Sequence, residues 1–127
     1  MGRKRASTEQ GITGTYEIST GTAEVVADEF RDGAYILNVN GVPSSHIVLG
    51  EPEELEFEYM RWIAAAVEHL NTRPANKLRV THLGGAGCSL PRYFASKLPG
   101  SRHTVVELDA KLGELVRTLF DLSLIHI

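Results

Sequence analysis

The chain has 127 residues, of which 43% are hydrophobic and 23% charged, a balance typical of one soluble globular domain. Its formal net charge of −3 gives no reason to expect nucleic acid or an anionic membrane as a partner. The single cysteine, Cys88, excludes an intramolecular disulfide, and no apolar run is long enough to span a bilayer, so we expect a cytoplasmic protein.

The first fifty residues predict a tail followed by a β meander. Residues 1–14 carry glycine, serine, threonine and charge without periodicity, which indicates a disordered tail. Apolar residues alternate over residues 15–50, and Asn40-Gly41 is a strong hairpin signal, so we predict a small antiparallel sheet. Because such a sheet buries one face only, it must pack on the rest of the chain or on a second subunit.

The next segment predicts a helix. Glu51-Pro52-Glu53-Glu54 is typical of a helix start, and Asn71-Thr72-Arg73-Pro74 is typical of a stop. Apolar residues recur between them at helical spacing, namely Leu55, Tyr59, Trp62, Ile63, Ala66 and Leu70. We interpret this stripe as facing the core, with the lining of a ligand pocket as the alternative for Trp62 and especially for Tyr59.

The stretch from Leu78 to Asp109 predicts a βαβ unit: an apolar strand, a turn of small residues, a helix over 89–98, and a second strand over 104–107. Glycines let the backbone approach a ligand, and the following helix favours anionic or polar ligand atoms at its start. Glu107, about twenty residues beyond the turn, can accept hydrogen bonds from the hydroxyls of a ribose. An adenosine ligand is therefore expected. The predicted cofactor-binding residues are Gly84, Gly85, Ala86, Gly87, Glu107 and Asp109. The alternative is that the turn merely joins a strand to a helix, and the missing third glycine of the G-x-G-x-x-G pattern weakens a dinucleotide site.

Beyond the second strand, Asp109 is expected to cap a helix that contains Leu112, Leu115, Val116 and Leu119. We predict an α/β protein with a partial Rossmann-like nucleoside-binding domain over residues 51–122 and an atypical tail over 123–127. A doubly wound sheet needs further βα units. Either the chain is a fragment, or a partner completes the sheet.

The sequence offers few other candidate catalytic or metal-binding residues. Cys88 at a helix start suggests either a reactive thiol or a small residue packed beside the turn. The five histidines show no metal-ligand spacing, so no metal is expected, and His82 is interpreted as a hydrogen-bonded interior or edge residue. Ser44-Ser45-His46 lacks the acid and the oxyanion loop of a catalytic triad.

Four motifs in order resemble those of the spermidine synthase family of aminopropyltransferases. Leu37–Gly41 (LNVNG) stands for the family's Leu-x-Leu-Asp-Gly, and Phe57–Ile63 (FEYMRWI) for Phe-x-Tyr-Gln-Glu-Met-Ile. Gly84–Ser89 (GGAGCS) stands for Gly-Gly-Gly-Asp-Gly-Gly, with Arg92 just beyond, and Glu107–Asp109 (ELD) for Glu-x-Asp. The similarity covers roughly residues 16–122.

The resemblance implies a small N-terminal β domain and a methyltransferase-like Rossmann domain. It also implies decarboxylated S-adenosylmethionine or S-adenosylmethionine as co-substrate and an amine acceptor, as in polyamine biosynthesis. Tyr59 would lie on the acceptor side. A homodimer through the N-terminal β region is possible.

Departures from the family pattern leave three functions open. The loop Asp is Gly87 here, the Gln and Glu of the helix motif are Met60 and Arg61, and the hairpin Asp is Asn40. A loop Asp would favour the decarboxylated donor over an intact carboxylate by about 1–4 kcal/mol. Because the segment carrying the family's general base is absent, the catalytic residues are unknown. The candidates are an aminopropyltransferase-like chain, an S-adenosylmethionine-dependent methyltransferase-like protein, and a non-catalytic adenosine-binding or dimerising module.

Overall fold

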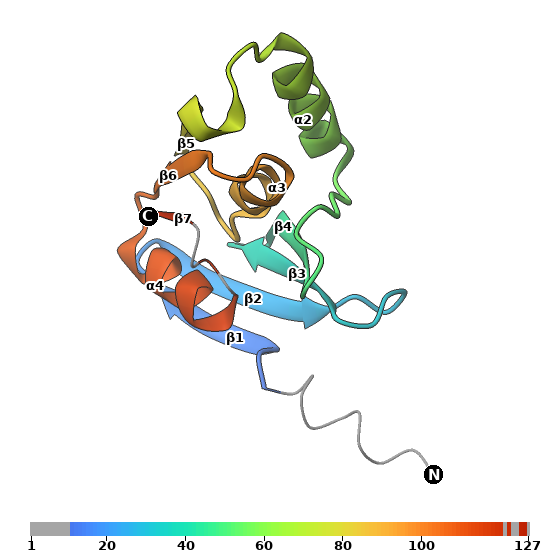
Figure 1. The fold of residues 1–127 in the computed structure, drawn as a ribbon. Helices are drawn as coiled ribbons and strands as arrows, with labels where there is room; N and C mark the ends of the chain where they lie inside the picture. The colour runs from blue at the N-terminus through green and yellow to red at the C-terminus, as the bar shows by residue number, and fades with distance from the viewer. Residues whose placement is uncertain (1–10, 121, 123–124, 127) are drawn as a thin grey trace.

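The structure is a computed structural model that describes residues 11–120, 122 and 125–126. Most of the predicted N-terminal tail and part of the predicted atypical tail therefore lie outside the described residues. Within these residues the chain forms an antiparallel sheet, a smaller parallel sheet and three α-helices (Figure 1). The predicted α/β class is confirmed. None of the helices in the described part is long and apolar enough to cross a bilayer.

The antiparallel sheet is a meander. Its strands, in the order β1-β2-β3-β4, are β1 (Gly14–Ile18), β2 (Gly21–Ala27), β3 (Ala34–Val39) and β4 (Val42–Val48). Asn40 and Gly41 join β3 to β4 with φ values of 51° and 79°. Two consecutive positive φ angles give the turn a twist that matches the twist of the strands. The predicted small antiparallel sheet and its Asn-Gly turn are confirmed.

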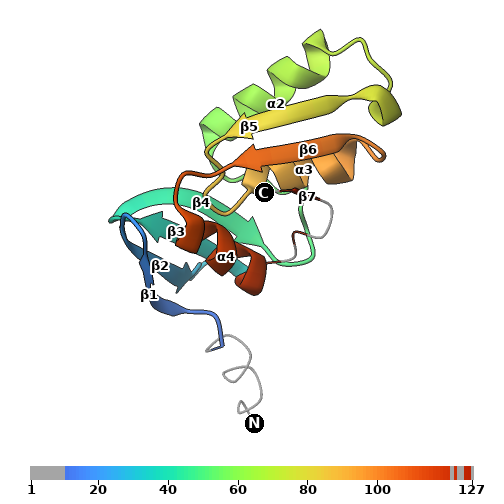
Figure 2. The ribbon, with the colours of Figure 1, turned by 90° about the vertical axis from the view of Figure 1, so that its left-hand side faces the viewer.

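The parallel sheet has the order β5-β6-β7, with β5 (Arg79–Leu83), β6 (Arg102–Val106) and β7 (Ile125–His126). A short 3-10 helix, η1 (Ala75–Lys77), precedes β5, and α3 (Ser89–Lys97) connects β5 to β6 (Figure 2). The predicted βαβ unit is present. Ile125 and His126, which the sequence places in an atypical tail, pair with His103 and Thr104 of β6.

The first predicted helix is wrong at its start and in its orientation. Helix α2 (Glu58–Leu70) begins after Phe57, and the preceding residues are irregular. Glu51 and Glu54 both bind the guanidinium of Arg31, so their carboxylates hold the β2–β3 hairpin instead of a first helical turn. Arg31 thus brings this segment back to the antiparallel sheet.

The apolar stripe of α2 does not face the core. Tyr59 is 51% exposed, Trp62 66% and Leu70 75%, whereas the buried residues of α2 are Met60 and Ala64. Helix α2 contacts α3. No described element covers the stripe, which corrects the core-facing interpretation.

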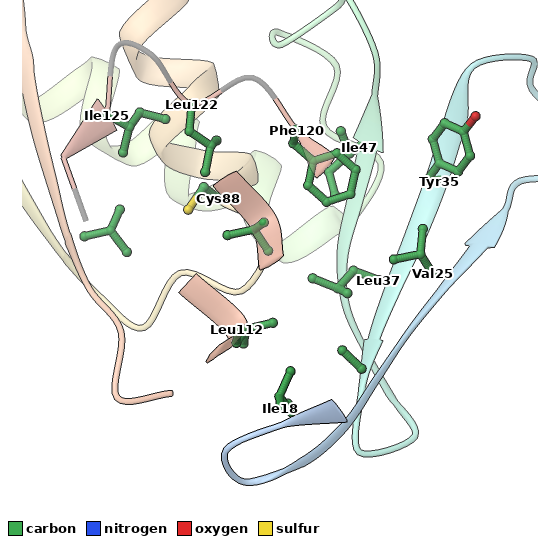
Figure 3. Packing of buried hydrophobic residues seen from close by; sticks show 13 residues of the cluster. Ile18, Val25, Tyr35, Leu37, Ile47, Cys88, Leu112, Phe120, Leu122 and Ile125 are labelled. Carbon is green, nitrogen blue, oxygen red and sulfur yellow. The ribbon is translucent and has the colours of Figure 1, made fainter. Parts of the chain in front are cut away.

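The turn between β5 and α3, residues 84–88, is called the glycine turn below. The main core lies between the antiparallel sheet, the glycine turn and α4 (Ala110–Leu119), as Figure 3 shows. Its largest fully buried side chains include Leu37, Ile47, Val25, Val105 and Val116. Phe120, Leu122 and Ile125 close the same cluster. The antiparallel sheet therefore packs on the α/β part, one of the two outcomes that its single apolar face predicts.

Candidate functional site

A cleft of about 390 Å³ opens where the glycine turn, the end of β6, the start of α2 and the β3–β4 hairpin meet. Its lining residues are Val39, Ser44, Tyr59, Met60, His82, Gly84, Gly85, Ala86, Ser89, Leu90, Pro91, Glu107 and Leu112. The volume falls within the range of small-molecule sites. Five predicted site residues, Gly84, Gly85, Ala86, Glu107 and Tyr59, thus come together, whereas Gly87 and Asp109 do not line this cleft.

Glu107 lies directly against the glycine turn. One carboxylate oxygen, Oε2, accepts hydrogen bonds from the backbone N–H groups of Gly85 and Ala86 at 3.1 and 3.3 Å. The other, Oε1, accepts from the N–H of Asp109 at 3.1 Å. Since a carboxylate offers about four lone-pair positions, about one is left for a ligand.

The backbone N–H groups of the turn are satisfied within the protein. Glu107 takes those of Gly85 and Ala86, and Ser45 Oγ accepts from Gly87 N at 2.9 Å. These three hydrogen bonds hold the turn in place, so the N–H groups of Gly85, Ala86 and Gly87 are already occupied within the protein.

Two of the glycines are required by packing. A Cβ on Gly85 would lie 2.5 Å from Val105 Cγ1, and one on Gly87 would lie 2.7 Å from Ile47 Cδ1. Both distances are far inside van der Waals contact, so the turn is pressed onto β6 and β4. The Cα of Gly87 therefore faces the sheet, and its predicted role as a ligand contact stays a prediction. Gly84 differs, because it has φ of +76° and open space around its Cα.

The turn also holds two non-glycine residues at positive φ, Ala86 at 46° and Cys88 at 61°. Such conformations cost energy and persist only where surrounding contacts enforce them. Cys88 is buried in the main core, and burial, followed by the charge of Glu107, raises the pKa of its thiol to about 11. This environment supports the packed small residue and argues against the reactive thiol.

Asp109 belongs to the scaffold. It is 2% exposed, and its carboxylate accepts from Ser19 N, Thr20 N, Thr20 Oγ1 and Leu112 N at 2.7–3.0 Å. Burial alone would raise its pKa, but the hydrogen bonds from Leu112 and Thr20 hold the pKa below the usual range. The predicted cap of α4 is confirmed. The same carboxylate links α4 to the β1–β2 turn, and its predicted ligand role stays a prediction.

His82 lines the cleft and is hydrogen-bonded to a chain of side chains behind it. Its Nε2 lies 3.0 Å from His103 Nδ1, and His103 Nε2 lies 2.8 Å from Ser101 Oγ. Burial, followed by the neighbouring His103, lowers the pKa of His82 to about 4. His82 is therefore neutral at physiological pH. The predicted hydrogen-bonded edge residue is confirmed, and its place in the cleft was missed.

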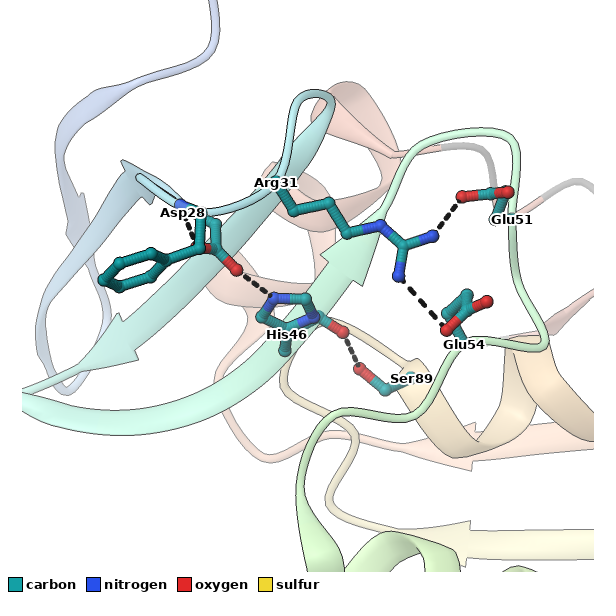
Figure 4. Close-up of polar contacts among 7 residues, drawn as sticks. Asp28, Arg31, His46, Glu51, Glu54 and Ser89 are labelled. Atoms are coloured by element: carbon teal, nitrogen blue, oxygen red, sulfur yellow. Dashed lines mark hydrogen bonds and ion pairs between the residues drawn. The ribbon is translucent and has the colours of Figure 1, made fainter.

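The segment Ser44-Ser45-His46 holds the turn. Besides the Ser45 bond to Gly87, Ser89 Oγ donates to the His46 carbonyl at 3.0 Å (Figure 4). His46 Nε2 lies 2.8 Å from Asp28 Oδ2, and this hydrogen bond lowers the pKa of Asp28. Strand alternation puts Ser45 and Ile47 on one face, but the sequence does not reveal that the glycine turn covers it. Within the described residues, no three His, Cys, Asp or Glu side chains are placed to hold a metal ion.

Comparison with known proteins gives one informative match. No family model matches the chain, and no curated protein matches it. Among solved structures, a probable spermidine synthase from Corynebacterium glutamicum ATCC 13032 matches with a TM-score of 0.83 and 50% sequence identity. The match covers 91% of this chain and 43% of that protein, so the chain spans less than half of its relative's length. The chain is therefore similar to the N-terminal portion of a probable spermidine synthase.

Proposed function

We propose that the cleft binds the adenosyl part of a sulfonium donor, either decarboxylated S-adenosylmethionine or S-adenosylmethionine. In this proposal the β5–α3–β6 unit is the opening part of a Rossmann-like, methyltransferase-type sheet, and the longer parent protein transfers an aminopropyl group to an amine. The observation that carries the proposal is the position of Glu107, which lines the cleft and lies against the glycine turn.

The chemistry of the cleft supports a nucleoside. Glu107 keeps about one acceptor position for a ribose hydroxyl, and Gly84 leaves open space beside it. Val39, Met60, Leu90 and Leu112 supply apolar surface for a flat base. Tyr59 lies at the side of α2, where the acceptor amine would approach in the proposed reaction.

Position 87 bears on the choice of donor. Gly87 has Ile47 and Ser45 against its Cα, so the turn has no room there for the carboxylate that would repel an intact donor. This favours S-adenosylmethionine as a second candidate ligand, and with it a methyltransferase-like function. The proposed reaction also needs a general base, and no residue is assigned that role here.

The test is calorimetric titration of the full 127-residue chain with decarboxylated S-adenosylmethionine, S-adenosylmethionine and methylthioadenosine. We expect all three to bind, and Glu107→Gln to weaken each about tenfold or more because the ribose loses a charged acceptor. Glu24→Gln, the same change at an exposed position of β2, is the matched control and should leave binding unchanged.

The relative affinities separate the candidates. A tenfold or greater preference for the decarboxylated donor would favour aminopropyl transfer, and equal affinity for the two donors would favour the methyltransferase-like function. If none of the three binds, or if nicotinamide dinucleotides bind equally well, the proposal is wrong and a non-catalytic module becomes the better account.

A further inference from the structure

His82 occupies a place in the cleft that none of the sequence motifs assigns. It lies on β5, two residues before Gly84, and lines the same cavity as Glu107 and Tyr59. Its ring packs near Phe94 of α3 and near His103 of β6, at centroid distances of 6.4 and 5.3 Å. Of the cleft-lining residues, His82, Tyr59 and Glu107 are the ones with ionisable side chains.

The hydrogen-bond chain behind His82 has a defined direction. Ser101 Oγ lies 2.6 Å from the Leu98 carbonyl, which can only accept, so the hydroxyl proton of Ser101 is committed to it. Ser101 Oγ must then accept from His103 Nε2–H, which leaves Nδ1 of neutral His103 as an acceptor. His82 Nε2 must therefore donate to His103 Nδ1.

This direction fixes the tautomer of His82. With its proton on Nε2, neutral His82 keeps an unprotonated Nδ1, and the two ring nitrogens point in different directions, so Nδ1 faces away from His103. In the described part of the chain, Nδ1 of His82 has no hydrogen-bond partner. Among the described residues, the buried side-chain nitrogen or oxygen atom without a hydrogen-bond partner is His46 Nδ1, so Nδ1 of His82 is not fully buried. Nδ1 of His82 is thus an accessible acceptor.

An acceptor without charge suits one part of the proposed ligand. A protonated amine that enters the cleft loses water and needs hydrogen-bond acceptors in return. Glu107 has about one acceptor position left, and the turn offers no carboxylate because Gly87 has no room for a side chain. His82 lines the same cavity, and Nδ1 is the ring nitrogen that it has left to accept a hydrogen bond.

We propose that His82 determines the specificity of the cleft by accepting a hydrogen bond from the side-chain amine of the sulfonium donor, and that Ser101 and His103 are positioning residues that keep its Nδ1 unprotonated. This inference rests on the proposed function, because it takes the donor as the ligand. It adds a recognition contact that distinguishes an amine-bearing ligand from a plain thioether nucleoside.

The test compares ligands with and without the amine. His82→Phe should weaken decarboxylated S-adenosylmethionine about tenfold, or ~1.4 kcal/mol, and should leave methylthioadenosine, which lacks the aliphatic side-chain amine, within about twofold. His82→Gln, whose side-chain carbonyl can accept, should restore part of the loss. His69→Phe, on the exposed side of α2, is the matched control.

A second measurement reads the positioning role directly. Long-range proton–nitrogen NMR spectra should show His82 with its proton on Nε2 in the wild-type chain. In His103→Phe, Nε2 of His82 loses its acceptor, so the spectra should show a mixture of His82 tautomers. Calorimetric titration of the same variant should show weaker binding of the sulfonium donor.

The outcomes separate the two proposals. If the wild-type chain binds none of the ligands, the proposed function fails and this inference fails with it. If the wild-type chain binds but His82→Phe weakens both ligands equally, or neither, or if His82 carries its proton on Nδ1, the inference is wrong while the proposed function stands.

Discussion

The two sheets of this protein differ in how completely they are covered. The antiparallel sheet packs on α4 and the glycine turn, and Leu37 and Ile47 are fully buried there. The parallel sheet and α2 leave large apolar side chains exposed, namely Trp62, Leu70, Leu83, Val106 and Leu108. The cleft lies where the two regions meet.

Because of this difference, the region that should stabilise the fold most is not the region with exposed apolar side chains beside the cleft. Burial of apolar surface is the main stabilising contribution in folding, so most of the free energy of unfolding should come from the region around α4. The exposed stripe of α2 contributes little to the fold of the described residues. The glycine turn belongs to both regions, because one side packs on β4 and β6 while the other lines the cleft.

The largest expected difference is between a buried and an exposed apolar residue. Leu37→Ala should lower the free energy of unfolding by about 3–4 kcal/mol, because it leaves a cavity between the sheet and α4. Trp62→Ala should change it by less than about 0.5 kcal/mol, although it removes more atoms. Urea denaturation followed by circular dichroism measures both, and equal losses would show that α2 is covered in solution.

A smaller difference is expected within the glycine turn. Gly87→Ala should destabilise the chain by about 1–3 kcal/mol, because its Cβ would collide with Ile47 and Ser45. Gly84→Ala should destabilise the chain by about 1–2 kcal/mol, from its positive φ alone. It should also weaken nucleoside binding, because its Cβ would occupy open space beside the cleft that the proposed ligand would use. Thermal unfolding and calorimetric titration of both variants check this, and equal effects on binding would contradict the two-sided turn.

The last expected effect depends on pH and concerns the link between the two regions. Asp109→Asn keeps a capping side chain but loses charge-assisted hydrogen bonds from Ser19 and Thr20, and should destabilise the chain at pH 7. Because the folded pKa of Asp109 is lowered, its contribution is complete above the unfolded pKa of about 3.9 and is lost as the pH falls below it.

Stability measured between pH 6 and pH 2.5 checks this sign. The wild-type chain should lose its advantage over Asp109→Asn across the acidic end of that range. Glu17→Gln, at an exposed position of β1, is the control and should follow the wild-type curve. A gap between wild type and Asp109→Asn that stays constant down to pH 2.5 would mean that Asp109 has an ordinary pKa in the folded chain.

Local sequence signals predicted the parts of the fold that depend on local chemistry. Asn40-Gly41 predicted its hairpin because the turn needs positive φ at both residues. Asp109 predicted the start of α4 because its side chain caps the residue three positions later. The start of α2 was missed because Glu51, expected in its first turn, binds Arg31, which is twenty residues earlier in the sequence. The orientation of α2 depends on packing that local signals do not show.

The candidate site was predicted only in part, because local signals place residues that follow one another along the chain and miss contacts with distant residues. Strand, turn and acid follow one another along the chain, so Gly84, Gly85, Ala86 and Glu107 could be placed together. Gly87 and Asp109 have the residue types of a ligand site, yet their partners are Ser45 and Thr20, which are distant in the sequence. His82 was not expected in the cleft, because an isolated histidine in a strand carries no local signal.

The hydrogen bonds of Asp109 make the folding of the antiparallel sheet and of the β5–α3–β6 unit depend on each other. They join residues that are 89 and 90 positions apart, and Ser45 joins the sheet to Gly87 over 42. A shortened chain that lacks the first fifty residues would leave Asp109 and Gly87 without these partners and would open the core at Leu112 and Val116 to water. Attempts to transplant the glycine turn and its acid into another protein should therefore carry the sheet along with them.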